Sequence, residues 1–283
     1  MRRVIFALAC SSPAYSASTS FQVTTANLAA WNLSGFQPTP RGKAKTFANA
    51  ILYLDPEVLV LVEVNPDFIA AEILAELMEQ GICYRRAILD QTASQNITIL
   101  YKTGVELSNP RLVPGSDNNN ALLRKAFAAN LKIGEFDFVL IAVHMKAGRG
   151  VSDRAVRDSQ AQAIATFIQA ATAGAEKDVI VAGDYNMIPG QDQSNFSQMN
   201  PNNFLSFVSD GLAGEFSHIG SSGPGNLLDG FAVSMGFTSE YIADSLRIVR
   251  MNDILGLSLI DYRNTVSDHL PLDAVFRITE DDD

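Results

Sequence analysis

The sequence Asp-Val-Ile-Val-Ala-Gly-Asp-Tyr-Asn at positions 178–186 decides how the rest of the chain is interpreted. Its short apolar run, rich in β-branched residues, predicts a buried strand that ends at Gly183. Asp184 and Asn186 follow, and alternate residues of an extended segment point the same way, so a carboxylate and a carboxamide would project together. That pair suits an acceptor for a metal or a water beside a donor for a phosphoryl oxygen. Gly-Asp-x-Asn is also an ordinary turn sequence, so the other segments have to decide.

Several other apolar runs of the chain also end on, or contain, polar side chains. In chain order these are Asn32, Glu63, His144, Asp229 and the adjacent pair Asp268 and His269. Each has an ordinary interpretation when taken alone. Glu63 fits a solvated strand end, and Asp229 followed by Gly230 fits a surface bulge. An Asp inside an apolar strand is costly to bury, however, unless it has a partner.

Together with Asp184 and Asn186, these residues resemble in type and order the motifs of the endonuclease/exonuclease/phosphatase superfamily. That superfamily includes pancreatic-type deoxyribonucleases, abasic-site endonucleases, inositol-polyphosphate phosphatases and neutral sphingomyelinases. The resemblance runs from about Phe21 to Ile278. It implies a four-layer α/β/β/α sandwich of two packed mixed sheets, with the site at one end of the sandwich.

The pattern of elements agrees with an α/β fold. Strand-like and helix-like segments alternate from residue 21 to 80, a further helix is predicted at 153–173 with Ser152 as its cap, and 108–120 is predicted to be a polar loop. Helices at both ends of a strand-rich middle would also fit a plain doubly wound sheet. With 283 residues and 47% hydrophobic composition, one domain over residues 20–279 is expected, followed by an acidic tail at 280–283.

The N-terminal residues resemble a secretory signal. Two arginines, a short apolar run and a series of small residues predict a signal peptide over residues 1–17, and therefore a secreted or periplasmic protein. The alternatives are a disordered cytosolic N-terminus, a misassigned start codon, or a lipid-modified Cys10. No other segment approaches the ~20 apolar residues of a membrane span. No stable membrane insertion is therefore expected, and no oligomeric state is predicted.

Hydrolysis of a phosphate ester needs a nucleophilic water, positive charge at the phosphoryl oxygens and help for the leaving oxygen. The resemblance implies a Mg²⁺ or Mn²⁺ ion bound by Glu63, Asn32 and Asp268, and hard divalent ions do prefer oxygen ligands. It also implies that Asp229 orients a histidine that acts as general base. The candidate for that histidine is His269. An imidazole with an ordinary pKa near 6.5 suits proton abstraction at neutral pH.

The remaining predicted roles concern the substrate. Asp184 would orient the attacking water or contact the metal, Asn186 would hydrogen-bond the phosphoryl group, and His144 would donate to a phosphate oxygen or assist the leaving group. Lys146 and Arg149 would form a positive substrate-binding rim behind His144. Arg154 and Arg157 either join this rim or form a solvated helix face. His218 is interpreted as an ordinary hydrogen-bonded strand histidine.

Two departures from the superfamily argue against abasic-site repair. Ser34 stands where abasic-site endonucleases have a second acidic residue, and the segment from His144 to Gly148 replaces their Tyr-Val-Pro-Asn-type loop. The chain is acidic, with a formal charge of −10, which argues against broad electrostatic wrapping of nucleic acid. A divalent ion can nevertheless neutralise a phosphate locally.

Three functions remain open from the sequence. The leading hypothesis is a secreted, metal-dependent phosphodiesterase that acts on nucleic acid. The second is a phosphatase or sphingomyelinase-type phosphoesterase with the same catalytic residues, although the long loops are polar rather than apolar. The third is a catalytically silent interaction module, against which the complete set of site residues argues.

Overall fold

The computed structural model describes residues 20–27, 40–64, 68–93, 95–279 and 281. The predicted signal peptide and Asn32 lie outside the described residues. Strands and helices alternate at the start of the chain and strands dominate its middle, so the predicted α/β class is confirmed. Among the helices of the described ranges, none is long and apolar enough to cross a membrane.

The first of the two large sheets has the strand order β13-β14-β1-β2-β4-β3. Its strands are β1 (Ser20–Asn27), β2 (Val58–Val64), β3 (Tyr84–Ile88), β4 (Asn96–Lys102), β13 (Arg247–Ile248) and β14 (Leu272–Arg277). The sheet is mixed, because β1 runs parallel to β2 but antiparallel to β14. Nearly every residue of β2 is buried, as its uninterrupted apolar run requires of a strand covered on both faces.

The second large sheet has the strand order β5-β6-β7-β8-β12-β9. Its strands are β5 (Glu106–Leu112), β6 (Phe127–Ile133), β7 (Phe136–His144), β8 (Val179–Asp184), β9 (Leu205–Ser206) and β12 (Asp229–Ser234). Here β7 and β8 are parallel. The predicted loop at 108–120 is wrong in its first part, because β5 extends into it. The sequence of this edge strand shows no apolar alternation, because its side chains are mostly exposed and its register shifts between Ser108 and Arg111.

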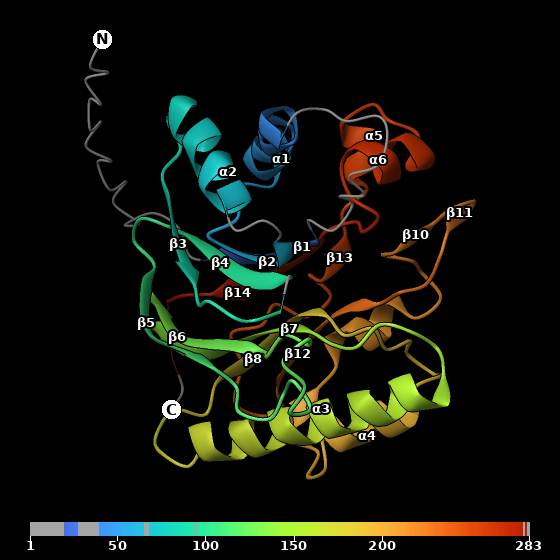
Figure 1. Ribbon diagram of the computed structural model, residues 1–283. Coiled ribbons are helices and arrows are strands. Elements are labelled where there is room, and N and C mark those ends of the chain that lie inside the picture. The colour runs from blue at the N-terminus through green and yellow to red at the C-terminus, as the bar shows by residue number, and fades with distance from the viewer. Residues whose placement is uncertain (1–19, 28–39, 65–67, 94, 280, 282–283) are drawn as a thin grey trace.

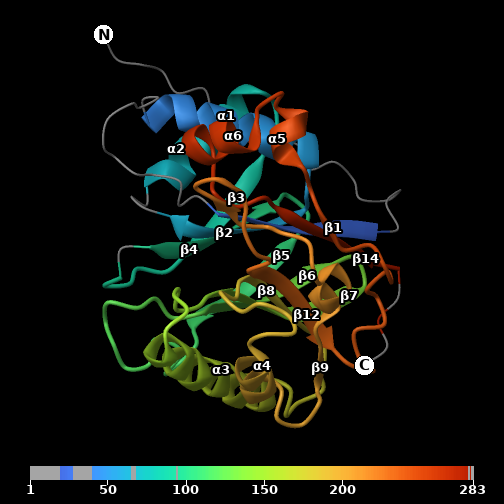
Figure 2. The ribbon, with the colours of Figure 1, turned by 90° about the vertical axis from the view of Figure 1, so that its right-hand side faces the viewer.

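Helices lie on the outer side of each sheet (Figures 1 and 2). Over the first sheet are α1 (Pro40–Leu54), α2 (Phe68–Glu79), α5 (Met251–Ile254) and α6 (Leu259–Thr265). Over the second are α3 (Val151–Ala171) and α4 (Gln193–Met199). The short segments η1 (Val208–Leu212), β10 (Ile219–Gly220) and β11 (Gly223–Pro224) complete the described elements. Helix α3 begins earlier than predicted, and its N-cap is Gly150 rather than Ser152.

The sheets face each other across a shared apolar core. Phe21 of β1 and Phe276 of β14 meet Phe136 and Phe138 of β7, and the rings of Phe21 and Phe138 lie 5.7 Å apart. Burying such rings contributes roughly 1.5–3 kcal/mol each. This packing holds β2 of one sheet against β7 and β8 of the other. The ends of these three strands carry Glu63, His144 and Asp184.

Candidate active site

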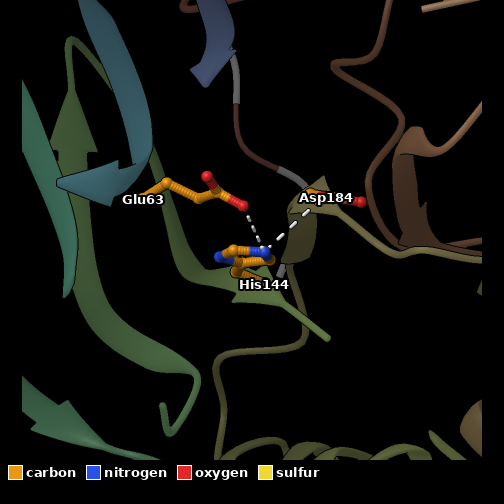
Figure 3. Close-up of side chains that lie close together, drawn as sticks. All are labelled: Glu63, His144 and Asp184. Atoms are coloured by element: carbon orange, nitrogen blue, oxygen red, sulfur yellow. Dashed lines mark ion pairs between the residues drawn. The ribbon is translucent and has the colours of Figure 1, made fainter. Parts of the chain in front are cut away.

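A bulge near the end of β2 orients Glu63. The pairing of β2 with β4 shifts register between Leu61 and Val64, and Glu63 has a φ of 57°. A bulge of this kind re-aims a side chain out of the strand's normal alternation. The left-handed backbone costs a non-glycine residue roughly 1–3 kcal/mol. In Figure 3, Glu63 reaches from β2 toward His144 on the facing sheet.

A glycine lets the ends of β7 and β8 lie close together. Gly183 has a φ of 137°, and a Cβ atom at this position would stand 2.2 Å from the carbonyl oxygen of Val143. No larger residue fits this close backbone approach. The parallel register then places Asp184 directly beside His144. The glycine that ends the predicted strand is therefore required by the geometry of the site.

His144 lies between two carboxylates. Its Nε2 atom is 3.1 Å from Oε1 of Glu63 and 3.6 Å from Oδ2 of Asp184, and Figure 3 shows both contacts meeting at the ring. Burial, helped by the charge of Arg124, lowers the pKa of His144 to about 4. Burial disfavours the charged form of Glu63, but the hydrogen bond from His144 and the positive charges around the carboxylate together outweigh burial, so the pKa of Glu63 is lowered. A neutral imidazole thus donates through Nε2 to an ionised glutamate.

These three side chains fit a divalent metal ion. Glu63, His144 and Asp184 each offer a ligand atom, and these atoms all lie within 4.8 Å of one another. Burial raises the pKa of Asp184 to about 7, an effect that the charge of His269 only partly opposes. A buried carboxylate with so little compensating positive charge suits a bound cation.

The cluster differs in membership from the predicted metal ligands. Of those, Glu63 belongs to it, Asn32 lies outside the described residues, and Asp268 is not in it. Oδ1 of Asp268 is buried and finds no hydrogen-bond partner within the described ranges. The cluster also includes Asp184, for which metal contact was one of two predicted roles, and His144, which was predicted to contact substrate or assist the leaving group. The metal role of Asp268 stays a prediction.

Asp229 and His269 form a buried pair. Nδ1 of His269 is 2.6 Å from Oδ2 of Asp229, and the antiparallel register of β12 and β8 sets Asp229 opposite Asp184. Burial opposes the imidazolium, but the charge and hydrogen bond of Asp229, followed by Asp184 and Asp268, raise the pKa of His269 to about 10. A cation bound among these carboxylates would favour the neutral imidazole that a general base requires.

Asn186 is also held tightly beside this cluster. Its φ is 52°, its backbone N–H donates to Oδ1 of Asp184 at 2.8 Å, and its side-chain Nδ2 donates to Oδ2 of Asp184 at 2.9 Å and to the carbonyl of Met145 at 3.2 Å. The turn that follows β8 therefore binds back onto its own aspartate. Asn186 is placed at the site, where its predicted role would require it.

Arg124 is a site residue that sequence reasoning missed. Its buried guanidinium donates from Nε to the carbonyl of His144 at 2.9 Å and from an NH2 group to the carbonyl of Met145 at 3.0 Å. It therefore fixes the end of β7 and adds positive charge near Glu63. An arginine in a polar segment carries no local signal of this role, because its partners lie about twenty residues away.

The positive side chains predicted to form a substrate-binding rim behind His144 are mostly paired with carboxylates. Nζ of Lys146 is 2.8 Å from Asp153, so its charge is paired. Arg149 is half-exposed and donates to Asp192 at 2.6 Å and to the carbonyl of Asn186 at 2.6 Å. Arg154, also half-exposed, lies 3.3 Å from the same Asp192 carboxylate. Arg149 thus connects the rim directly to Asn186.

Arg157 contradicts both interpretations offered for it. Its side chain is fully buried rather than exposed on a rim or a helix face. It donates to the carbonyls of Lys146 and Gly148, both at 2.8 Å, and lies 3.6 Å from Asp192. A guanidinium has five N–H donors and can satisfy several loop carbonyls at once, which offsets its burial. Arg157 therefore supports the loop that carries Lys146 and Arg149.

His218 also differs from its expected role as a hydrogen-bonded strand histidine. Its ring lies against that of His269, with the centroids 5.1 Å apart in an edge-on arrangement. Within the part of the chain that the structure describes, its ring nitrogens make no hydrogen bond. All three histidines of the chain are thus associated with this site.

Comparison with known proteins identifies the family. Residues 29–269 match the Endonuclease/Exonuclease/phosphatase family, and the chain belongs to it. The fold is similar to that of truncated TDP2 from Caenorhabditis elegans (15% identity, TM-score 0.68, 91% of this chain and 97% of that one). It is also similar to the human Nocturnin catalytic domain with bound sulfate (18%, 0.63, 91% and 94%). A third similar structure is the 3′-5′ exonuclease NExo from Neisseria meningitidis (15%, 0.66, 90% and 99%). No curated protein matches the chain in sequence.

Proposed function

We propose that this chain is a secreted, metal-dependent phosphodiesterase that hydrolyses phosphodiester bonds of nucleic acid. The observation that carries the proposal is the juxtaposition of two buried groups. One is the cluster of Glu63, His144 and Asp184. The other is the Asp229–His269 pair, in which Asp229 lies opposite Asp184 in the β8–β12 ladder. The first suits a divalent ion and the second suits proton transfer to or from water.

Each side chain has a role that follows from its contacts. A bound Mg²⁺ or Mn²⁺ would supply positive charge at the phosphoryl oxygens. Because Nδ1 of His269 is engaged by Asp229, Nε2 is the atom left to accept a proton from the attacking water. Asp184 orients that water or contacts the metal, and Asn186 hydrogen-bonds the phosphoryl group once substrate displaces one of its present acceptors. Asp268 and Asn32 complete the proposed metal ligands.

Two further observations support nucleic acid as the substrate. Arg149, which donates to the carbonyl of Asn186, and Arg154 are both half-exposed and share the single carboxylate of Asp192, so their two positive charges exceed its one negative charge. Among the similar structures are D. rerio TDP2 complexed with a single-strand DNA product and Neisseria NExo bound to a product DNA hairpin. Phosphates next to the cleaved bond would be recognised by such arginines.

The finer aspects of the fold and location belong to the same proposal. The order of helices and sheets in Figures 1 and 2 supports a four-layer α/β/β/α sandwich. The composition of residues 1–17 supports export from the cytoplasm.

The experiment is a substrate panel with the purified protein. Plasmid DNA, single-stranded DNA, RNA, bis(4-nitrophenyl) phosphate, 4-nitrophenyl phosphate, inositol phosphates and sphingomyelin are each incubated with Mg²⁺, with Mn²⁺ and with excess chelator. We expect metal-dependent cleavage of nucleic acid and no turnover in chelator. Uncut nucleic acid together with phosphate release from a monoester, or choline phosphate release from sphingomyelin, would replace the proposal with the phosphatase or lipid alternative.

A further inference from the structure

The backbone holds His218 next to His269. The two residues form an antiparallel bridge, and hydrogen bonds on either side keep it in register. Ile219 N–H donates to the carbonyl of Asp268 at 2.7 Å, and Leu270 N–H donates to the carbonyl of Ser217 at 2.8 Å. Because these are main-chain contacts, they place residue 218 beside residue 269 whatever the side chain is.

The ring of His218 is held in place but keeps its polar atoms available. On one side it contacts the ring of His269 at 5.1 Å. On the other it lies against Gly225, where a Cβ atom would come within 2.6 Å of Nδ1 of His218. The side chain is only half-buried, and over the described ranges neither ring nitrogen has a hydrogen-bond partner. His144 and His269, in contrast, each bind a carboxylate.

We propose that His218 is a substrate-contacting residue whose imidazole N–H donates a hydrogen bond to an oxygen of the phosphoryl group bound beside His269. The imidazolium carries two N–H donors and each neutral tautomer carries one, so the contact does not require a charged ring. The inference rests on the proposed function, because it places a phosphate ester at His269. It adds a second phosphoryl contact to the one proposed for Asn186.

Three substitutions separate a hydrogen bond to substrate from simple packing. His218→Ala removes both ring and donor, His218→Phe keeps the ring contact with His269 but lacks a donor, and His218→Gln keeps a donor without an aromatic ring. Loss of a hydrogen bond to a charged oxygen is expected to raise KM about tenfold or more in the Ala and Phe variants. The value of kcat should change little, because the contact exists in both ground and transition states. The Gln variant should recover part of the loss.

Two outcomes of these kinetics would overturn the proposal. One is an unchanged KM in His218→Ala. The other is full recovery in His218→Phe with none in His218→Gln, because the ring would then serve only to pack against His269. Thermal unfolding of each variant reports whether the fold is retained. An inactive wild-type protein would instead refute the proposed function.

Binding of inorganic phosphate tests His218 without turnover. The chain has three histidines, so the imidazole signals in an NMR spectrum are few, and the spectrum of His218→Gln identifies the one that belongs to residue 218. In the presence of Mg²⁺, we expect phosphate to shift this signal saturably, whereas chloride at equal ionic strength leaves it unchanged. A His218 signal that does not respond to phosphate would contradict the proposal.

Discussion

Asp229→Asn is the substitution that most sharply separates charge from shape at the candidate site. The carboxylate of Asp229 accepts from Nδ1 of His269 at 2.6 Å, and both side chains are buried. An amide of the same size can keep this hydrogen bond through its oxygen but loses the negative charge. We expect turnover to fall, because the imidazolium that forms when His269 takes a proton is no longer stabilised.

The structure gives the magnitude and the direction in pH. A hydrogen bond to a charged group contributes roughly 1.5–3 kcal/mol, which corresponds to about a 10- to 150-fold loss of kcat. Asp229 raises the pKa of His269, so its neutralisation lowers that pKa. The neutral base then exists at lower pH, and the acidic limb of the pH–rate profile moves toward lower pH while its plateau falls.

The assay is kcat as a function of pH at saturating Mg²⁺, together with thermal unfolding. Asp273→Asn is the matched control, since Asp273 of β14 is also buried and is ion-paired with Arg247 at 2.9 Å rather than with a histidine of the site. It should lower the unfolding temperature and leave kcat within about twofold. The reasoning fails if Asp229→Asn retains kcat within about twofold, or if the acidic limb moves to higher pH.

Three further predictions follow from the same contacts. Glu63→Gln should raise the metal concentration for half-maximal activity at least about tenfold, because the amide lacks the charge that holds a divalent ion; an unchanged Mg²⁺ titration would exclude Glu63 as a ligand. Gly183→Ala should lower the free energy of unfolding in urea by about 2–4 kcal/mol, because its Cβ would stand 2.2 Å from a carbonyl oxygen, and a wild-type midpoint would contradict the close strand approach. The log–log salt slope for oligonucleotide binding should be about 2 to 4 and flatten by about 1 in Arg149→Gln; a much steeper slope would indicate a wide basic surface instead.

The parts of the fold that local pattern determines could be predicted from the sequence. The run before Asp184 is apolar because β8 is buried on both faces, so the strand and its end are visible in the residues themselves. The same is true of β2 and β7. Asp229 and His269, forty residues apart, could be paired only through the resemblance to a known family, and the structure places them 2.6 Å apart.

The remaining features depend on contacts between distant segments. The apolar run before Glu63 predicts a strand but not the bulge that turns Glu63 toward His144. A charged residue on a long helix is expected to be exposed, since burial of an unpaired charge is costly. Arg157 is nevertheless buried, because loop carbonyls from a neighbouring segment accept hydrogen bonds from its N–H groups. The short helices α4 to α6 have too few turns to show an apolar period.

The most direct test of the account is single-turnover cleavage of the nucleic acid substrate identified by the panel, by wild type and by His269→Ala at saturating Mg²⁺. His269 is the predicted proton acceptor. Its Nδ1 contacts Asp229, so Nε2 is the nitrogen that would take the proton from water. The account predicts a cleavage rate about 10²- to 10⁴-fold lower in the variant, with substrate and metal affinities close to wild type and the fold retained. A variant that cleaves at more than about half the wild-type rate would contradict the assignment of His269 as the base.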